Sequence, residues 1–443
     1  MENPRRKAYK VLLAINGGKA FSNEEVQKSL NEQSMTEKDA RLFTALVYGV
    51  LQNQMALDLM ISRGINRPMK KLDAEALVIL RIALFQIYYL DRVPAYAAVN
   101  EAVKTAQKFK PALRGFVNGV LRGLLHQETT PEKEIEKLSD SDEKFALNHS
   151  VPHWITEKYL QVYSKEQVEI LFSRLNRVPP LTLRTNTLKT SPDGLMADLM
   201  AQGFEISKGT VAEEALYVED IPEELLITDT ESYRQGHFTI QDEGAMLAGH
   251  WLAPQKGECI LDMCAAPGGK TTHLAQAMAN TGTIVARDLY DHRLEFIRST
   301  AQRMGFTNIQ IQQVDGRLHN PSEFELYDKV LLDAPCSGLG VIGRKPEIRY
   351  RTDPNAISEL LPLQAALLEN AFKVLKPGGF LLYSTCTVNP AENEEQIVKI
   401  MEKHPELAMV ELPPYLDNHY YCPKERGSDC FYLCKLQKKD RGH

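Results

Sequence analysis

Two cysteines stand in polar turns of this chain and could act as nucleophiles. Cys336 lies in the segment DAPCSG, and Cys386 lies in the segment YSTCTVNPAENEE. Each follows a short apolar run that is typical of a buried strand. A thiolate that adds to an electrophilic ring carbon divides a difficult substitution into easier steps. A free thiol with a pKa of about 8.5 is only a few per cent ionised at neutral pH, so neighbouring groups must help to form the thiolate.

A glycine turn upstream predicts a bound nucleoside. The apolar run 259–261 indicates a strand, and the run 270–278 indicates a helix. The turn between them lets a ligand approach the backbone at the carboxyl edge of a parallel sheet. It matches neither the dinucleotide nor the triphosphate motif, so S-adenosylmethionine is the better fit. The turn consists of Cys264, Ala265, Ala266, Pro267, Gly268, Gly269 and Lys270.

Three aspartates follow or end later strands of the same region. Asp288 lies twenty positions after Gly268, about the spacing of an acid that binds ribose hydroxyls. Asp315 is placed to reach an adenine edge, and Asp333 opens the DAPCSG segment. A single aspartate of this kind is equally well explained as a loop cap. The set at successive strand ends favours a ligand site.

A methyl donor beside two thiols indicates methylation of cytosine at carbon 5. A thiolate that adds to carbon 6 makes carbon 5 nucleophilic, and a base must later remove the carbon-5 proton. Lys270 is a candidate to stabilise the thiolate, and Asp333 is a candidate to hydrogen-bond the cytosine. DNA cytosine methyltransferases use a Pro-Cys thiol as nucleophile, so the chemistry alone does not rank Cys336 against Cys386.

The elements that must position these residues alternate between strand and helix from Gly257 onward, which predicts a parallel, doubly wound α/β sheet. Strands are expected at 259–263, 283–286, 309–314, 329–332 and 380–384. Residues 151–250 predict a small α/β domain, and 127–150 predict a polar linker. In residues 4–125, apolar residues recur in stripes with the period of an α-helix, and no strand pattern appears. This indicates an all-α bundle. The domains expected are therefore 1–126, 127–150, 151–250 and 251–443.

Charge is distributed unevenly along the chain. Residues 1–125 contain 19 Lys and Arg against 11 Asp and Glu, whereas the whole chain has a net charge of -6. The basic segment suggests a polyanion partner, and ordinary solvated helix faces explain it equally well. All seven cysteines lie at or beyond Cys259 without C-x-x-C pairs, so we expect free thiols and no metal site. We expect a cytoplasmic protein without a membrane span.

The motifs together resemble the RsmB-type (Sun/Fmu) RNA (cytosine-5) methyltransferases. CAAPGGKT, DAPCSGLG and YSTCTVNPAENEE carry the resemblance in the catalytic region. ILRIALFQIYYLDRVPAYAAVNEAV and RGFVNGVLRGLL resemble the NusB-like RNA-binding domain of the same family. The resemblance runs nearly from end to end and implies a Rossmann-like S-adenosylmethionine-dependent methyltransferase domain at the C-terminus.

The resemblance also implies residue roles. Cys386 is the expected nucleophile, and Cys336 is expected to assist proton removal and product release. Residues 264–270, Asp288, Asp315 and Asp333 are expected to contact the methyl donor. The chain departs from the family pattern at Arg287 and at Glu347, where the family often has Asp.

The expected substrate is one cytosine of 16S rRNA, free or in an early small-subunit particle, and a monomer is expected. Transfer RNA is the alternative substrate for the same chemistry. A non-catalytic RNA-binding or antitermination factor is the alternative of another class. The presence of both cysteines and all the strand-end acids argues against that factor.

Overall fold

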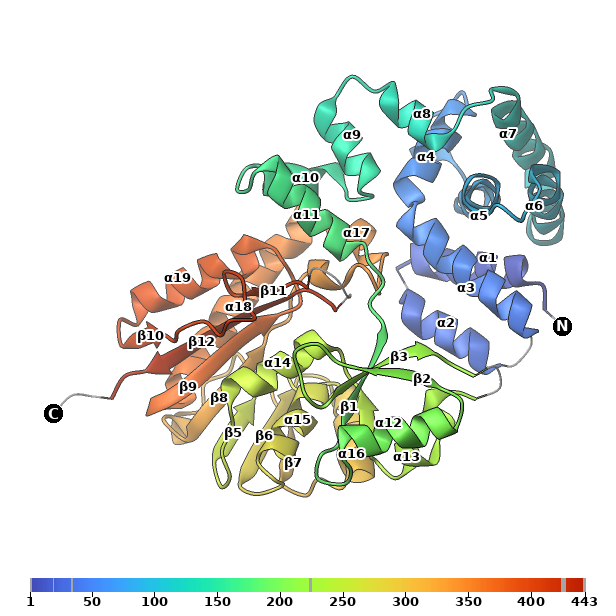
Figure 1. The fold of residues 1–443 in the computed structure, drawn as a ribbon. Helices are drawn as coiled ribbons and strands as arrows, with labels where there is room; N and C mark the ends of the chain where they lie inside the picture. The colour runs from blue at the N-terminus through green and yellow to red at the C-terminus, as the bar shows by residue number, and fades with distance from the viewer. Residues whose placement is uncertain (1, 19, 33–34, 223–224, 424–427, 441–443) are drawn as a thin grey trace. The chain divides into compact units, whose positions relative to one another are not determined.

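The computed structural model of the chain describes residues 2–18, 20–32, 35–222, 225–423 and 428–440. They belong to two compact units, one of residues 1–176 with 342–351 and one of residues 177–341 with 352–443. Figure 1 shows the elements of each. Among the described residues, no helix is long and apolar enough to cross a membrane.

The first unit is built from helices, as the stripes in the sequence predict. Thr36 accepts a hydrogen bond from the Asp39 backbone amide and so starts α3, because a side-chain oxygen satisfies an amide that has no partner within the helix. Phe43 and Val47 lie one turn apart on that helix and are fully buried in a core that spans α1 to α7. The helices are α1 (Pro4–Asn16), α2 (Ser22–Asn31), α3 (Glu37–Gln52), α4 (Gln54–Arg63), α5 (Ala74–Tyr89), α6 (Ala95–Phe109), α7 (Arg114–His126), α8 (Pro131–Glu136), α9 (Ser141–Asn148), α10 (His153–Leu160), α11 (Lys165–Leu175) and α17 (Ile348–Arg351).

Residues 127–150, predicted as a linker, contain the helices α8 and α9. Ile135 and Leu147 are buried in a small cluster with Ala56 of α4. Two apolar residues, each on a short helix, are enough to bury a face here, although the segment as a whole is polar. Helices α10 and α11 belong to the same unit, with the rings of Phe145 and Phe172 6.1 Å apart.

A segment that follows the DAPCSGLG motif also belongs to this helical unit. Glu347 is buried and accepts hydrogen bonds from the backbone amide and the hydroxyl of Ser22, both at 2.8 Å. Arg349 donates to the Ser150 carbonyl oxygen at 2.6 Å. Glu347, a departure from the family pattern, therefore stabilises the N-terminus of α2 in this chain.

The second unit contains a large mixed sheet in the order β10-β12-β9-β8-β5-β6-β7. Neighbouring strands from β9 to β7 are parallel, which confirms the predicted doubly wound fold. β12 runs antiparallel to β9 and β10, and β11 pairs with β12. The strands are β5 (Cys259–Asp262), β6 (Thr283–Asp288), β7 (Ile309–Gln313), β8 (Tyr327–Asp333), β9 (Leu375–Thr385), β10 (Leu407–Met409), β11 (Tyr420–Tyr421) and β12 (Phe431–Lys438).

Helices cover both faces of this sheet (Figure 1). Successive strand residues point to opposite faces, so Leu261 and Leu332 pack with α18 and α19, whereas Ile260 and Leu331 pack with α14, α15 and α16. This explains why β5 and β8 are apolar without alternation. The helices are α14 (Glu243–Leu252), α15 (Gly269–Ala277), α16 (Asp291–Met304), α18 (Pro354–Val374) and α19 (Glu394–Lys403).

A smaller antiparallel sheet in the same unit has the order β2-β3-β1-β4. Leu183 and Phe238 of this sheet pack against Leu195 and Leu199 of α12 in a separate core. This agrees with the predicted small α/β domain. Its elements are β1 (Leu181–Thr185), α12 (Pro192–Ala201), β2 (Glu205–Lys208), β3 (Ala215–Asp220), α13 (Glu231–Arg234) and β4 (Phe238–Ile240).

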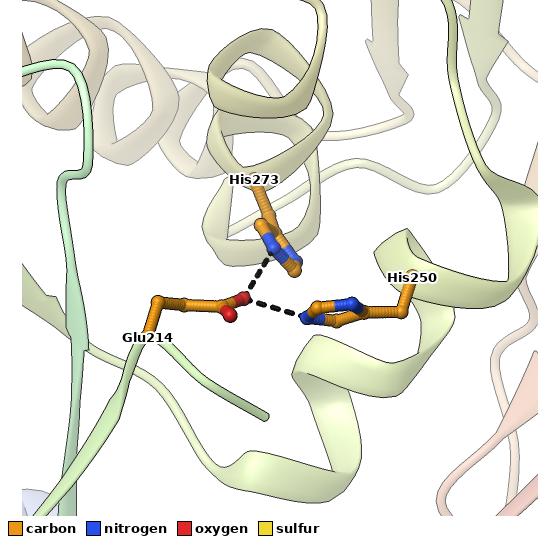
Figure 2. A group of neighbouring side chains, drawn as sticks. All are labelled: Glu214, His250 and His273. Carbon is orange, nitrogen blue, oxygen red and sulfur yellow. Dashed lines mark hydrogen bonds and ion pairs between the residues drawn. The ribbon is translucent and has the colours of Figure 1, made fainter. Parts of the chain in front are cut away.

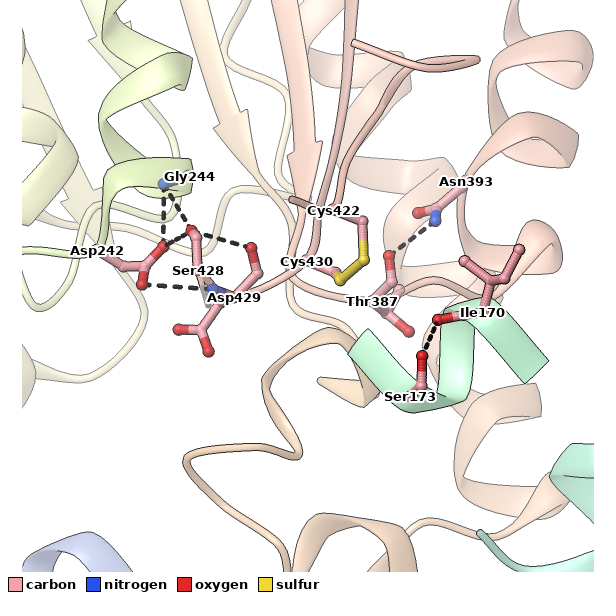
Figure 3. The surroundings of a disulfide bond; sticks show 10 residues. All are labelled: Ile170, Ser173, Asp242, Gly244, Thr387, Asn393, Cys422, Ser428, Asp429 and Cys430. Carbon is pink, nitrogen blue, oxygen red and sulfur yellow. Dashed lines mark hydrogen bonds between the residues drawn. A yellow bond between two sulfur atoms is a disulfide. The ribbon is translucent and has the colours of Figure 1, made fainter. Parts of the chain in front are cut away.

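Cys422 and Cys430 form a disulfide, so the prediction that all seven cysteines are free thiols is wrong for this pair (Figure 3). Their Cα atoms lie 4.5 Å apart because β11 and the start of β12 pair as antiparallel neighbours. Next to the disulfide, the Ser428 hydroxyl accepts from the Gly244 amide at the start of α14. The five other cysteines are free.

Candidate active site

The structure brings the two candidate nucleophiles together at the carboxyl edge of the large sheet. β8 and β9 are parallel neighbours, with Asp333 opposite Ser384, and the loops that follow them carry Cys336 and Cys386. The two sulfur atoms lie 3.5 Å apart. Both thiols are partly exposed. A single pyrimidine ring at this edge could therefore meet both sulfur atoms.

Burial and nearby carboxylates act on the Cys336 thiol. The pKa of Cys336 is raised well above its usual value by its hydrogen bond with Cys386, by burial and by the nearby carboxylates of Glu392 and Asp333. Cys336 therefore keeps its proton at neutral pH and can share it with the Cys386 sulfur.

Lys270 and Asp333 form an ion pair beside these thiols. The Lys270 ammonium lies 2.6 Å from Oδ2 of Asp333, and Oδ1 of the same carboxylate accepts from the Ser384 hydroxyl at 2.7 Å. The ammonium also lies 4.9 Å from the centre of the Phe431 ring. Lys270, which was predicted to stabilise the thiolate, is thus paired with Asp333, which was predicted to hydrogen-bond the cytosine.

The conformation and the packing of the turn both require glycine at position 268. Gly268 has a φ of 101°, a conformation that side chains other than glycine rarely adopt, and a Cβ there would lie 3.1 Å from Cα of Ile297. Gly269 is the first residue of α15, so the free amides of that helix start at the turn. The adjoining Cys264 is not a reactive thiol, since burial raises its pKa.

Asp262, the last residue of β5, is a site residue that the sequence analysis missed. Its side chain is buried, and burial raises its pKa to about 7. Oδ2 accepts from the Thr271 hydroxyl at 2.7 Å, while Oδ1 has no partner among the described residues. A buried acceptor without a donor at the glycine turn fits a ligand that brings a cationic or N–H group. Its place at the end of an apolar run was the feature that could have identified it.

The other strand-end acids pair with arginines. Asp288 is buried and lies 3.0 Å from Arg293, which also donates to the Ala266 carbonyl oxygen of the turn. Asp315 lies 2.6 Å from Arg317. Arg287, a departure from the family pattern, pairs with Glu323 at 2.6 Å.

Glu392 joins the two cysteine loops, and its role was also missed. Its buried carboxylate accepts from the amide and hydroxyl of Ser337, next to Cys336, at 2.8 and 2.5 Å. It also accepts from Asn389, in the loop after Cys386, at 2.9 Å. It belongs to the YSTCTVNPAENEE segment, but its partners could not be read from the sequence. The carboxylate fixes the distance between the loops.

Glu392→Gln should lower kcat by about 100-fold, because a small displacement of the reacting groups has an effect of this size. The amide nitrogen of the substituted side chain would face the Ser337 amide or the Asn389 side chain. Both of these groups are donors, so a hydrogen bond would be lost. Steady-state methyl transfer and thermal unfolding should be measured together. Glu394→Gln is the matched control, since Glu394 binds Tyr420 at 3.0 Å and neither cysteine loop. Equal rates for the two variants would contradict this role.

Arg184 of β1 binds the end of the glycine turn through its guanidinium. Its guanidinium is fully buried and donates to the Gly269 carbonyl oxygen at 2.7 Å and to the Thr272 hydroxyl at 2.9 Å. It also binds Gln241. Burial lowers its pKa to about 9. The small sheet thereby positions the first turn of α15.

The fold and this site define a Rossmann-like methyltransferase joined to a helical N-terminal domain and a small α/β domain. Residues 249–437 match the family described as 16S rRNA methyltransferase RsmB/F. Residues 2–126 match the NusB family, and residues 151–222 match the ferredoxin-like domain of RsmF/B-like methyltransferases.

Named relatives match over nearly the whole chain. Ribosomal RNA small subunit methyltransferase B of Salmonella typhi is 34% identical over 98% of this chain and 97% of its own length. The protein of that name from Erwinia tasmaniensis is 34% identical over 92% of each chain. The solved structure of PH0851 has a TM-score of 0.85 and 26% identity, and covers 99% of this chain and 100% of its own. The chain belongs to the family of ribosomal RNA small subunit methyltransferase B, whose members use S-adenosylmethionine.

Proposed function

We propose that this protein transfers the methyl group of S-adenosylmethionine to carbon 5 of one cytosine in 16S rRNA through a covalent cysteine–cytosine adduct. The observation that carries the proposal is the 3.5 Å separation of the Cys336 and Cys386 sulfur atoms at neighbouring strand ends. The family supports an rRNA substrate, since its named members act on the small ribosomal subunit. We further propose a monomeric, cytoplasmic enzyme.

The Cys386 thiolate forms a bond to carbon 6 of the cytosine, which makes carbon 5 nucleophilic. S-adenosylmethionine, when bound, would supply the electrophilic methyl group that carbon 5 attacks. A base then removes the carbon-5 proton, and the carbon–sulfur bond breaks to release Cys386 as a thiolate. The net products are 5-methylcytosine, the demethylated cofactor and one proton.

Three groups of this chain support these steps. Cys336 is neutral beside the nucleophile, so it would first give its proton to solvent, and this is the one proton released in the net reaction. Its thiolate would then bind the carbon-5 proton tightly, because its pKa is raised. The ion pair of Lys270 with Asp333 lies where it can hydrogen-bond the cytosine ring and stabilise the adduct.

Residues of the glycine turn and the strand ends would hold the cofactor. Cys264 to Lys270 would contact it through the backbone, and Asp288, Asp315 and Asp333 through side chains. Oδ1 of Asp262, which has no partner among the described residues, would accept from its amino group. The target base must be unstacked or already single-stranded to reach a sheet edge.

Purified protein with labelled S-adenosylmethionine should transfer label to 16S rRNA from cells that lack this enzyme. Bisulfite sequencing should then place the label at carbon 5 of one cytosine. Transfer RNA and fully modified rRNA are the comparison substrates. Absence of transfer to 16S rRNA, or transfer to another atom, would disprove the proposal.

A further inference from the structure

Glu214, His250 and His273 form a cluster that the methyl-transfer reaction does not use (Figure 2). Nε2 of each imidazole lies 2.8 Å from the same oxygen, Oε1 of Glu214. One potential ligand atom from each residue lies within 4.8 Å of the others. Glu214 lies in the turn before β3, whereas the histidines come from α14 and α15.

The cluster is tightly packed on one side and open on the other. The side chains of Glu214 and His273 are 7% and 5% exposed, whereas that of His250 is 39% exposed. The residue before His250 is Gly249, and a Cβ there would lie 2.5 Å from Nδ1 of His273. A glycine is thus needed at this position to admit the His273 ring. The two rings meet edge to face with centroids 5.2 Å apart.

We propose that Glu214, His250 and His273 bind a divalent first-row transition-metal ion, with Zn²⁺ as the best match. Two imidazole nitrogens and one carboxylate oxygen are ligands that zinc prefers, and a water molecule on the exposed His250 side would complete a tetrahedral site. Mg²⁺ and Ca²⁺ prefer oxygen ligands and match this set poorly. Each imidazole would bind the ion through Nε2 as a neutral ring, with its proton on Nδ1 instead of on the nitrogen that now faces Glu214.

The surroundings set the expected strength of the site. Nδ1 of His273 has no hydrogen-bond partner among the described residues, so packing rather than an outer hydrogen bond orients this ring. Outer hydrogen bonds of metal-bound histidines contribute about 10- to 100-fold in affinity. We therefore expect micromolar rather than nanomolar binding. The bound ion would tie the small α/β domain to α14 and α15, as a structural rather than a catalytic metal.

Calorimetric titration of metal-free, tag-free full-length protein with ZnCl₂ and with MgCl₂ tests this proposal. We expect one Zn²⁺ per chain at this site, a rise in unfolding temperature and no response to Mg²⁺. His250→Gln and Glu214→Gln should each weaken this binding by about tenfold or more. His250 is the safer position, because its exposed side chain can change without affecting the core.

His404→Gln is the matched control. His404 contacts Glu369 at 2.9 Å, but Lys403 also contacts that carboxylate at 2.9 Å, and no second histidine of the described part of the chain joins the pair. The control should bind Zn²⁺ like the parent protein. Zn²⁺ held by the thiols of Cys336 and Cys386 would persist in all three variants. Equal Zn²⁺ binding by the parent and both site variants, or an equal response to Mg²⁺, would overturn the proposal.

Discussion

Cys336→Ala should accumulate a covalent protein–RNA adduct that survives a denaturing gel, while turnover falls by about 100-fold or more. Cys386 can still add to carbon 6 in this variant, but the group assigned to proton removal is gone, so elimination stalls. The variant should be incubated with S-adenosylmethionine and unmodified 16S rRNA. The measurement is the fraction of protein that migrates with RNA.

Cys386→Ala should form no adduct and transfer no methyl group, since no thiol remains to attack carbon 6. The double variant with Cys336→Ala should behave in the same way. Cys259→Ala is the thiol control, because Cys259 lies at the start of β5 and hence at the opposite edge of the sheet. An adduct in Cys386→Ala would reverse the roles of the two cysteines.

Arg184→Met should lower both the free energy of unfolding and the affinity for S-adenosylmethionine. The substitution leaves the buried Thr272 hydroxyl oxygen without its donor, at a cost of about 1–3 kcal/mol, and removes one of the donors to the Gly269 carbonyl oxygen. The first turn of α15 would then lose its fixed position beside the cofactor. We expect about a tenfold weaker cofactor affinity by calorimetry, alongside a lower unfolding temperature.

Two further variants separate positioning from stability. Arg184→Lys should recover part of the affinity, because one ammonium can replace one of the lost donors. Arg303→Met removes another arginine of the same unit, which donates to the carbonyl oxygens of Tyr233 and Phe238 at 2.8 and 2.9 Å but not to the glycine turn. It should destabilise the protein without changing cofactor affinity. Equal affinity losses in the Arg184 and Arg303 variants would refute a positioning role.

Local patterns predicted much of the fold. The runs at Cys259 and Val330 are apolar because both faces of their strands, β5 and β8, are covered, and this makes buried parallel strands visible in the sequence. The stripe from Phe43 to Leu51 marked a helix because its buried residues repeat with the helical period. The helices of segment 127–150 were not visible in the sequence, because both are short and bury few residues.

The sequence did not reveal which separate segments of the chain contact each other. β12 completes the sheet beside β9 and brings Cys430 near Cys422, yet nothing local to Phe431 specifies that pairing. The candidate metal site could not be predicted from the sequence either, because Glu214 and His273 meet only through the packing of the small sheet on α15.

The sequence by itself determined the chemistry available: two thiols, a glycine turn and a series of acids, each recognisable because it ends a strand with its own local pattern. Tertiary structure alone decided which groups touch. The 3.5 Å approach of Cys336 to Cys386, the pairing of Lys270 with Asp333 and the hold of Glu392 on both cysteine loops all join residues far apart in the chain. Such distances depend on strand order and side-chain packing, and neither is encoded within a single short segment.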